Sequence, residues 1–297
     1  MNCKKFDIPG ITFSTLDSGL EIISISNKYA SAKITTNGAH IFEYTPIGEK
    51  NLLWVSKRAF FVPGKPIRGG VPVCWPWFGA SLIEGRPGHG FVRVEEWQIS
   101  DIAELPSGAT KLVFTLDSDM KQFAMADFPF TVNMIFTIGK ELEMTLVMVN
   151  KGTEPVKIGC ALHTYFAISD INKVVVTGLD KCHYFDHKVG APRFEGNYQE
   201  GDVKVTSEID NVYFPAPGTT EIVDPGWGRI ITIEKSGSDS TVVWNPWIDK
   251  AARMADFGDE EYNNMLCVET ANAGSDVRLI LPGGSHCIST TISTEAL

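Results

Sequence analysis

The 297-residue chain lacks the long apolar run that a membrane-spanning helix requires. No apolar run approaches the ~18–20 residues needed to cross a bilayer, so we expect no membrane partner. The first seven residues, Met1 to Asp7, include two lysines but no apolar segment behind them, which is unlike a signal peptide. The six cysteines include no CxxC pair; they are residues 3, 74, 160, 182, 267 and 287. Several lie in apolar runs, where reduced cysteine behaves as a small hydrophobic residue, so we expect a cytoplasmic protein without disulfides.

The chain also lacks a block of basic residues, and its formal net charge is −10. Nucleic acids and anionic membranes attract positively charged surfaces, so neither is expected as a partner. An anionic small molecule could bind only through a few local arginines. Individual arginines therefore become candidates for a binding site.

Sequence motifs for several common activities are missing as well. No HxH, HExxH or CxxC spacing predicts a metal site, and we expect neither a metal nor another cofactor. There is no Walker loop, no GxSxG and no GxGxxG after a strand, so nucleotide binding and serine hydrolysis lack support.

Short apolar and β-branched runs recur along the whole chain and predict an all-β fold. Gly, Pro, Asn and Asp clusters separate them, a pattern typical of antiparallel sandwiches and barrels. The expected strands are Leu20–Ile25, Lys111–Leu116, Thr131–Ile138, Leu142–Val149, Lys173–Val176, Ile230–Ile233, Thr241–Trp244, Val277–Leu281 and Cys287–Ile292.

Helical pattern is sparse, as expected for a chain with 27 Gly and 16 Pro. We expect one short helix at Lys250–Phe257 and a further turn around Glu260–Met265. No composition break divides the chain, which predicts a single domain over residues 1–297 with residues 1–5 disordered. No coiled-coil pattern is visible, so a monomer is expected.

Two segments are too rich in Pro and Gly to be central strands. The first runs from Lys65 to Gly79 and places Arg68 beside Gly69-Gly70, followed by Trp75, Trp77 and Phe78. The second runs from Gly85 to Arg93 and flanks His89 with glycines, which let a backbone approach a ligand closely. Arginines in such loops can form forked contacts to phosphate, but they can equally be solvated surface residues.

His163 and Glu269 are ionisable residues inside apolar, strand-like runs. Burying such a group without a partner is costly, so each is expected to have a partner or a chemical task. Taken alone, each can be a satisfied core residue or a functional one.

Taken together, these segments resemble the aldose 1-epimerase (mutarotase) superfamily, and more narrowly its hexose-6-phosphate branch. The resemblance runs from about Ile22 to the C-terminus. It is carried by Ile67-Arg68-Gly69-Gly70-Val71-Pro72, Trp75-Pro76-Trp77-Phe78-Gly79, His89-Gly90-Phe91-Val92-Arg93, Leu162-His163-Thr164-Tyr165-Phe166, Ile209-Asp210-Asn211-Val212-Tyr213, Val243-Trp244-Asn245-Pro246-Trp247 with Lys250 and Met254-Ala255-Asp256-Phe257, and Cys267-Val268-Glu269. It implies a galactose mutarotase-like β-supersandwich of large antiparallel sheets, with the site in a cleft on one of them.

The resemblance also assigns roles to matching positions. It implies that His163 is the general acid and Glu269 the general base. It further implies that the substrate is bound by a set of residues comprising Arg68, His89, Arg93, Asp210, Trp75 and Gly88. Arg68 and Arg93 match the phosphate-binding positions, and His89 helps to position the ring. Two departures are Gly88, where relatives often have Gln, and Asn211, where many have Arg; Arg86 could compensate for the second.

The expected reaction is the interconversion of the α and β anomers of a hexose 6-phosphate by ring opening and reclosure. It needs a carboxylate and an imidazole on the two sides of the hemiacetal, and no cofactor. We expect Glu269 to be ionised and His163 to be protonated, because acidic surroundings raise the pKa of an imidazole. The aromatic residues Trp75, Trp77 and Phe78 would form an apolar wall for the sugar.

Two alternatives remain on the same fold. One is an aldose 1-epimerase for unphosphorylated sugars, and the other is a non-catalytic carbohydrate-binding protein. If Arg68 and Arg93 point into the cleft as a pair, a phosphorylated sugar is favoured. The presence of both His163 and Glu269 favours an enzyme.

Overall fold

Antiparallel β-sheet makes up most of the computed structural model, which describes residues 8–187 and 197–297. The expected disorder at residues 1–5 lies outside the described residues. The strands are β1 Ile11–Thr15, β2 Glu21–Ser26, β3 Ala30–Thr35, β4 His40–Pro46, β5 Val73–Cys74, β6 Gln98–Glu104, β7 Thr110–Asp117, β8 Phe130–Ile138, β9 Leu142–Asn150, β10 Val156–Ile158, β11 Cys160–Leu162, β12 Tyr165–Ala167, β13 Val175–Thr177, β14 Tyr184–Asp186, β15 Ile209–Tyr213, β16 Thr220–Asp224, β17 Arg229–Ser236, β18 Ser240–Asn245, β19 Met265–Asn272, β20 Arg278–Ile280 and β21 Ser285–Ala296. The helical segments are α1 Trp247–Arg253 and the 3₁₀ turns η2 Val92–Val94, η4 Glu261–Asn264 and η5 Gly274–Asp276.

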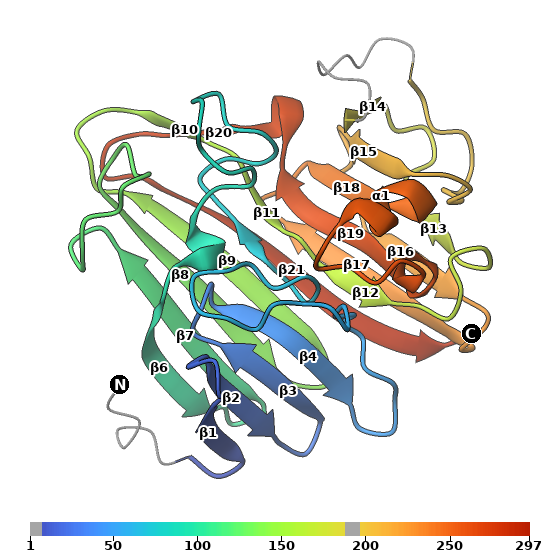
Figure 1. Ribbon diagram of the computed structural model, residues 1–297, viewed down its shortest axis with the longest axis horizontal. Helices are drawn as coiled ribbons and strands as arrows, with labels where there is room; N and C mark the ends of the chain where they lie inside the picture. The colour runs from blue at the N-terminus through green and yellow to red at the C-terminus, as the bar shows by residue number, and fades with distance from the viewer. Residues whose placement is uncertain (1–7, 188–196) are drawn as a thin grey trace.

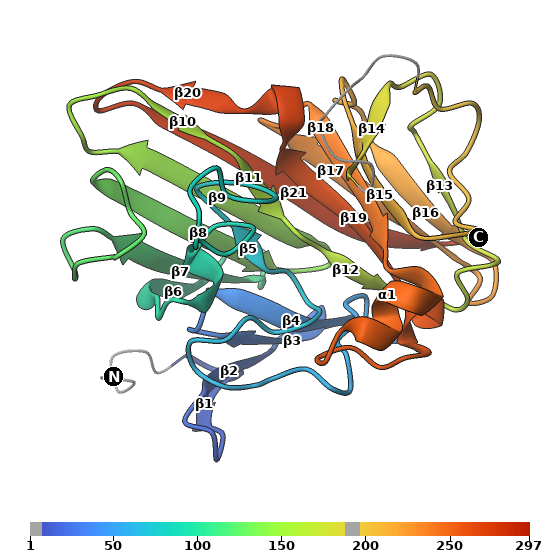
Figure 2. The same cartoon turned by 45° about the horizontal axis from the view of Figure 1, so that its top comes forward.

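Two large sheets form the body of the fold (Figure 1). One has eight strands in the order β13-β16-β17-β21-β9-β8-β7-β6. The other has seven, in the order β14-β15-β18-β19-β11-β5 with β12 also paired to β19. A four-stranded sheet, β1-β2-β3-β4, lies beside the eight-stranded one, in blue in Figure 2, and β10 and β20 pair as a separate ribbon. The expected all-β architecture of large antiparallel sheets with short helices is confirmed.

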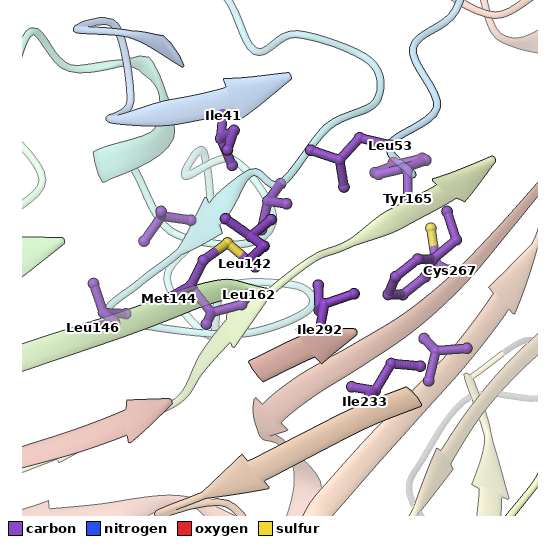
Figure 3. Close-up of a cluster of buried hydrophobic side chains, with 14 of the residues drawn as sticks. Ile41, Leu53, Leu142, Met144, Leu146, Leu162, Tyr165, Ile233, Cys267 and Ile292 are labelled. Carbon is purple, nitrogen blue, oxygen red and sulfur yellow. The ribbon is translucent and has the colours of Figure 1, made fainter. Parts of the chain in front are cut away.

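Side chains that alternate along the central strands fill the space between the two large sheets. In β8, Phe130, Val132, Met134 and Phe136 are buried while the residues between them are partly exposed. In Figure 3, Met144 of β9 and Ile292 of β21 from one sheet meet Leu162 of β11 from the other. Burial of a large apolar side chain contributes about 1.5–3 kcal/mol, so this core stabilises the platform under the pocket.

All nine expected strands are present within a few residues of their predicted ends. The expected helix at Lys250–Phe257 is displaced, because α1 begins at Trp247 and ends at Arg253. The Asn245 side chain accepts a hydrogen bond from the Trp247 backbone N–H just before the helix, and Met254 is already extended. No helix in the described ranges is long and apolar enough to cross a membrane.

Gly90 is required where the loop after β5 comes back against Trp75. Its φ is +71°, and a Cβ at this position would lie 1.8 Å from the Trp75 carbonyl oxygen. The same carbonyl accepts a hydrogen bond from the backbone N–H of Phe91. This close approach fixes the backbone between His89 and Arg93.

We expect Gly90→Ala to destabilise the fold far more than Gly85→Ala. Both glycines have positive φ, which costs an L-residue about 1–2 kcal/mol, but a Cβ at Gly85 meets nothing within 4 Å. Urea unfolding should show a loss of unfolding free energy in Gly90→Ala at least about twice that in Gly85→Ala. Equal losses would contradict the close approach to Trp75.

Candidate active site

A row of side chains crosses one face of the seven-stranded sheet, and all of them except the buried Cys267 line a pocket. Asp210 of β15 lies opposite Trp244 of β18. Trp244 in turn lies opposite Cys267 of β19, and Cys267 lies opposite Tyr165 of β12. Directly opposed residues in antiparallel strands share a face. Glu269 follows Cys267 by two residues and therefore points to the same face.

His163 lies in the short break between β11 and β12, where it is held by both backbone and ring contacts. Its N–H donates to the Pro72 carbonyl, and its ring stacks on that of Tyr165 at 4.8 Å between centroids. The imidazole Nδ1 lies 3.2 Å from Glu269 Oε1. The two groups expected to perform acid–base chemistry are therefore in contact, although they are more than 100 positions apart in the sequence.

Burial shapes the protonation of this pair. The exposed fraction of the side chain is 10% for His163 and 1% for Glu269. Burial, reinforced by the negative charge of Asp210, raises the pKa of Glu269 well above its usual value. Burial also lowers the pKa of His163, and the nearby His89, Arg68 and Arg93 lower it further. Both residues are thus biased towards their neutral forms.

The expectation that His163 is protonated because its surroundings are acidic is wrong for the unliganded pocket. Desolvation by burial lowers its pKa most, and the positive charges of Arg68 and Arg93 act in the same direction. The net charge of −10 belongs to the whole chain and does not set the field at His163.

Arg68 is oriented into the pocket by a carboxylate and a phenol. Its guanidinium donates to Tyr165 Oη at 2.9 Å and pairs with Asp256 at 3.2 Å. The following glycines allow the loop to pack closely, since a Cβ at Gly70 would meet Ile41 O and His40 Nε2 within 2.6 Å. Behind this loop, the buried His40 hydrogen bonds through Nε2 to the Gly69 carbonyl.

Arg93 has no ion pair with a carboxylate among residues 8–187 and 197–297. Its Nη2 donates to the Gly88 carbonyl at 2.8 Å. His89 packs edge-on against Phe78, and its ring centroid lies 5.7 Å from that of His163. Burial and the adjacent Arg93 lower the pKa of His89 to about 3, so its imidazole is neutral near pH 7. A neutral imidazole can both donate and accept hydrogen bonds to sugar hydroxyls.

These residues line one cavity of about 330 Å³, which is within the size range of small-molecule sites. It contains six of the eight residues predicted from the sequence: Arg68, His89, Arg93, His163, Asp210 and Glu269. The expected pair of arginines therefore faces the same cavity as the acid–base pair.

Trp75 and Gly88 are not in the lining, and the expected aromatic wall needs correction. Trp75 is only 1% exposed, and its ring packs against Phe91, Phe128 and Phe130 in the core. A large aromatic side chain gains more from this burial than from facing a wet cleft. Gly88 contributes only the carbonyl that holds Arg93.

Two further residues of the same loops, Trp77 and Arg86, lie outside the cavity. Trp77 donates to the Pro87 carbonyl outside the cavity, so Phe78 is the member of the expected wall that lines it. Arg86 forms a forked pair with Asp127 and lies under Trp77, so it does not replace a missing arginine near Asn211.

The structure adds lining residues that sequence reasoning missed: Tyr165, His187, Trp244, Lys250 and Met254. His187 Nδ1 lies 3.5 Å from Asp210 Oδ1, and Lys250 Nζ lies 3.8 Å from Asp210 Oδ2. Tyr165, Trp244, Lys250 and Met254 could have been found, since all four belong to motifs that carry the family resemblance. His187 follows strand β14 without any local pattern that would distinguish it.

Comparison with known proteins places this arrangement among sugar epimerases. The family profile described as aldose 1-epimerase matches residues 21–293. A protein from Cenchrus ciliaris named "Putative glucose-6-phosphate 1-epimerase" is 35% identical over 88% of this chain and 81% of its own length. A protein of the same name from Escherichia coli is 33% identical over 90% and 88%. The crystal structure of a protein from Salmonella typhimurium titled a "putative mutarotase" superposes with a TM-score of 0.89 at 29% identity, covering 98% of this chain and 96% of that one.

The buried His40 should make the stability of the fold depend on pH. Burial lowers its pKa from 6.5 to about 4, so between these values the unfolded chain binds a proton that the folded chain does not. This contribution to stability is present above pH 6.5 and is lost as the pH falls towards 4. In urea unfolding, wild type should lose up to about 3 kcal/mol more than His40→Gln over this interval. Parallel pH profiles for the two proteins would contradict the assignment.

Proposed function

The chain belongs to the aldose 1-epimerase family, and from this premise we propose that it interconverts the α and β anomers of glucose 6-phosphate or a closely similar hexose 6-phosphate. Family membership makes it an isomerase that acts on a sugar. The names of the relatives suggest a phosphorylated substrate, and the two arginines in the cavity support this assignment.

The observation that carries the proposal is the contact between His163 and Glu269 in the cavity. Glu269 removes the proton of the C1 hydroxyl while His163 delivers a proton to the ring oxygen. The C1–O5 bond breaks, the aldehyde rotates about C1–C2, and the reverse transfers close the ring on the other face. The products differ from the substrate only at C1, so no oxidant or other reactant is needed.

The pKa shifts suit these two tasks. A raised pKa makes the Glu269 carboxylate a stronger base, and a lowered pKa makes the His163 imidazolium a stronger acid. Each shift therefore strengthens the residue in the role that the proposed reaction gives it.

A bound phosphate group would change the protonation of His163 relative to that of Glu269. Arg68 and Arg93 lower the pKa of His163, and a phosphate dianion bound to either guanidinium offsets that positive charge. Bound substrate thereby favours the imidazolium next to the Glu269 carboxylate, which is the form that the reaction uses. The phosphate in this proposal both anchors the sugar and prepares the acid.

The alternatives each lack one feature. A mutarotase for unphosphorylated sugars has no need for Arg93, whose guanidinium faces the cavity without a carboxylate partner in the described chain. A non-catalytic sugar-binding protein has no need for two buried ionisable groups in contact, whose desolvation costs stability. The phosphate-specific enzyme accounts for both.

Some expectations about cellular context stay predictions. The five cysteines of the described residues are free, which is consistent with a reducing, cytoplasmic location. The expected monomer and the absence of nucleic acid and membrane partners likewise remain untested.

Replacing either member of the pair should remove most of the rate enhancement. We expect His163→Asn and Glu269→Gln each to lower kcat on α-glucose 6-phosphate by about 10²–10⁴-fold, because each removes one proton transfer. Polarimetry of freshly dissolved α anomer measures the rate. Glu260→Gln, at an exposed carboxylate away from the cavity, is the matched control and should retain wild-type rates. Unchanged rates in both site variants would overturn the assignment.

Arg93→Gln should weaken recognition of phosphate specifically. We expect KM for glucose 6-phosphate to rise by about 10–100-fold, as loss of a hydrogen bond to a charged group costs about 1.5–3 kcal/mol. The much slower reaction of free glucose should change little. Arg86→Gln is the control, since Arg86 pairs with Asp127 outside the cavity, and it should leave KM unaltered. Equal effects of Arg93→Gln on both sugars would contradict phosphate recognition.

A further inference from the structure

Three metal-ligating side chains converge beside the cavity: His163 and Glu269 line it, and Cys267 is fully buried next to them. One nitrogen of His163, Sγ of Cys267 and one carboxylate oxygen of Glu269 all lie within 4.8 Å of one another. Cys267 has no place in the acid–base reaction. It lies in β19 two residues before Glu269, and Figure 3 shows its sulfur beside Tyr165.

The spacing of these donors is close to that of a tetrahedral zinc site. Zinc–ligand bonds of about 2.0–2.3 Å place neighbouring tetrahedral ligands about 3.3–3.7 Å apart. The contact between His163 Nδ1 and Glu269 Oε1 is 3.2 Å, which already fits. The widest separation in the group, at most 4.8 Å, requires a donor to move by about 1 Å.

Unsatisfied polar atoms at the same place independently indicate a ligand. His163 Nδ1 and Glu269 Oε2 are buried and have no hydrogen-bond partner in the part of the chain that the structure describes. A buried polar group without a partner is costly, so a bound cation would relieve both atoms at once.

The charges of the group also fit a dication. With the thiol proton released to solvent, Cys267 and Glu269 supply two negative charges, which balance a divalent ion. Arg68 and Arg93 oppose a cation, but Arg68 is already paired with Asp256, and Asp210 adds a negative charge near Glu269. One imidazole, one thiolate and one carboxylate suit zinc, whereas Mg²⁺ and Ca²⁺ prefer oxygen ligands.

We propose that His163, Cys267 and Glu269 form a binding site for a thiophilic divalent cation such as Zn²⁺, and that the bound ion excludes the sugar substrate. Three protein ligands leave one position of a tetrahedral ion free, and two of the ligands, His163 and Glu269, line the cavity. The ion occupies both groups of the acid–base pair, so it inhibits the enzyme. Binding follows from the geometry alone, whereas inhibition rests on the proposed function.

Titration with Cd²⁺ tests binding without reference to activity. Cd²⁺ is a spectroscopically useful substitute for Zn²⁺, because a cadmium–thiolate bond gives an ultraviolet charge-transfer band. We expect a band that saturates at one equivalent, is absent in Cys267→Ser and Cys267→Ala, and persists in Cys287→Ser. Among the cysteines of residues 8–187 and 197–297, Cys287 is the exposed one that adventitious metal would choose, so it is the matched control. Loss of the band in Cys287→Ser, or its persistence in both Cys267 variants, overturns the proposal.

Competition between Cd²⁺ and the sugar tests where the ion binds. This experiment uses the wild-type protein, so it does not depend on whether the Cys267 variants fold. Glucose 6-phosphate should displace the Cd²⁺ band, and inorganic phosphate at Arg93 alone should not. A band that is insensitive to saturating glucose 6-phosphate, in a protein that anomerises this sugar, overturns the shared site.

Inhibition by Zn²⁺ supplies the second measurement and separates the two proposals. Each protein is compared with its own rate in chelator-treated buffer. The Zn²⁺ concentration for half inhibition should rise at least about tenfold in Cys267→Ser, because the thiolate is the ligand that favours zinc. Anomerisation without any Cys267-dependent metal binding refutes the metal site alone. Metal binding at Cys267 without anomerisation by the metal-free protein refutes the proposed function alone.

Discussion

The contact between a buried imidazole and a buried carboxylate is the constraint on which the rest of the site depends. Two ionisable groups held 3.2 Å apart and almost without solvent are stable only if the surrounding fold holds them in place. The seven-stranded sheet does this for Glu269, and the break between β11 and β12 does it for His163. The stack on Tyr165 links the pair to Arg68, because the same phenol accepts a hydrogen bond from that guanidinium. The proposed acid–base centre and the proposed anion-binding end are therefore connected through Tyr165.

The sequence predicts the fold well because alternation of apolar residues reports directly which face of a strand is buried. In β8 and β9 this period-two pattern is almost uninterrupted, and both strands were predicted nearly to the residue. The site is less predictable, because strands distant in sequence bring its members together. Cys267 illustrates the limit: no metal-ligand spacing includes it, yet sheet pairing places it beside His163 and Glu269. Trp75 illustrates the opposite error, since an aromatic residue in a loop rich in Pro and Gly can belong to the core.

Local charge, rather than net charge, governs this pocket. A protein with a formal charge of −10 nevertheless places the cationic Arg68 and Arg93 near enough to His163 to lower its pKa. In the proposed reaction an anionic substrate compensates these cations, so the groups that select the phosphate also regulate the acid. The same pocket offers a thiolate, an imidazole and a carboxylate to a soft cation. Substrate and metal are therefore expected to compete for His163 and Glu269. The arginines attract the anionic substrate, whereas the thiolate and the carboxylate attract the metal cation.

Exchange NMR on the wild-type protein tests the central claim most directly, because it observes both anomers at equilibrium without a coupled assay. Magnetisation transfer between the C1 protons of α- and β-glucose 6-phosphate is compared with that of free glucose at equal concentration, each with and without protein. The account predicts exchange of the phosphorylated anomers far above the rate in buffer, and a much smaller increase for glucose. Exchange at the buffer rate for both sugars would contradict it.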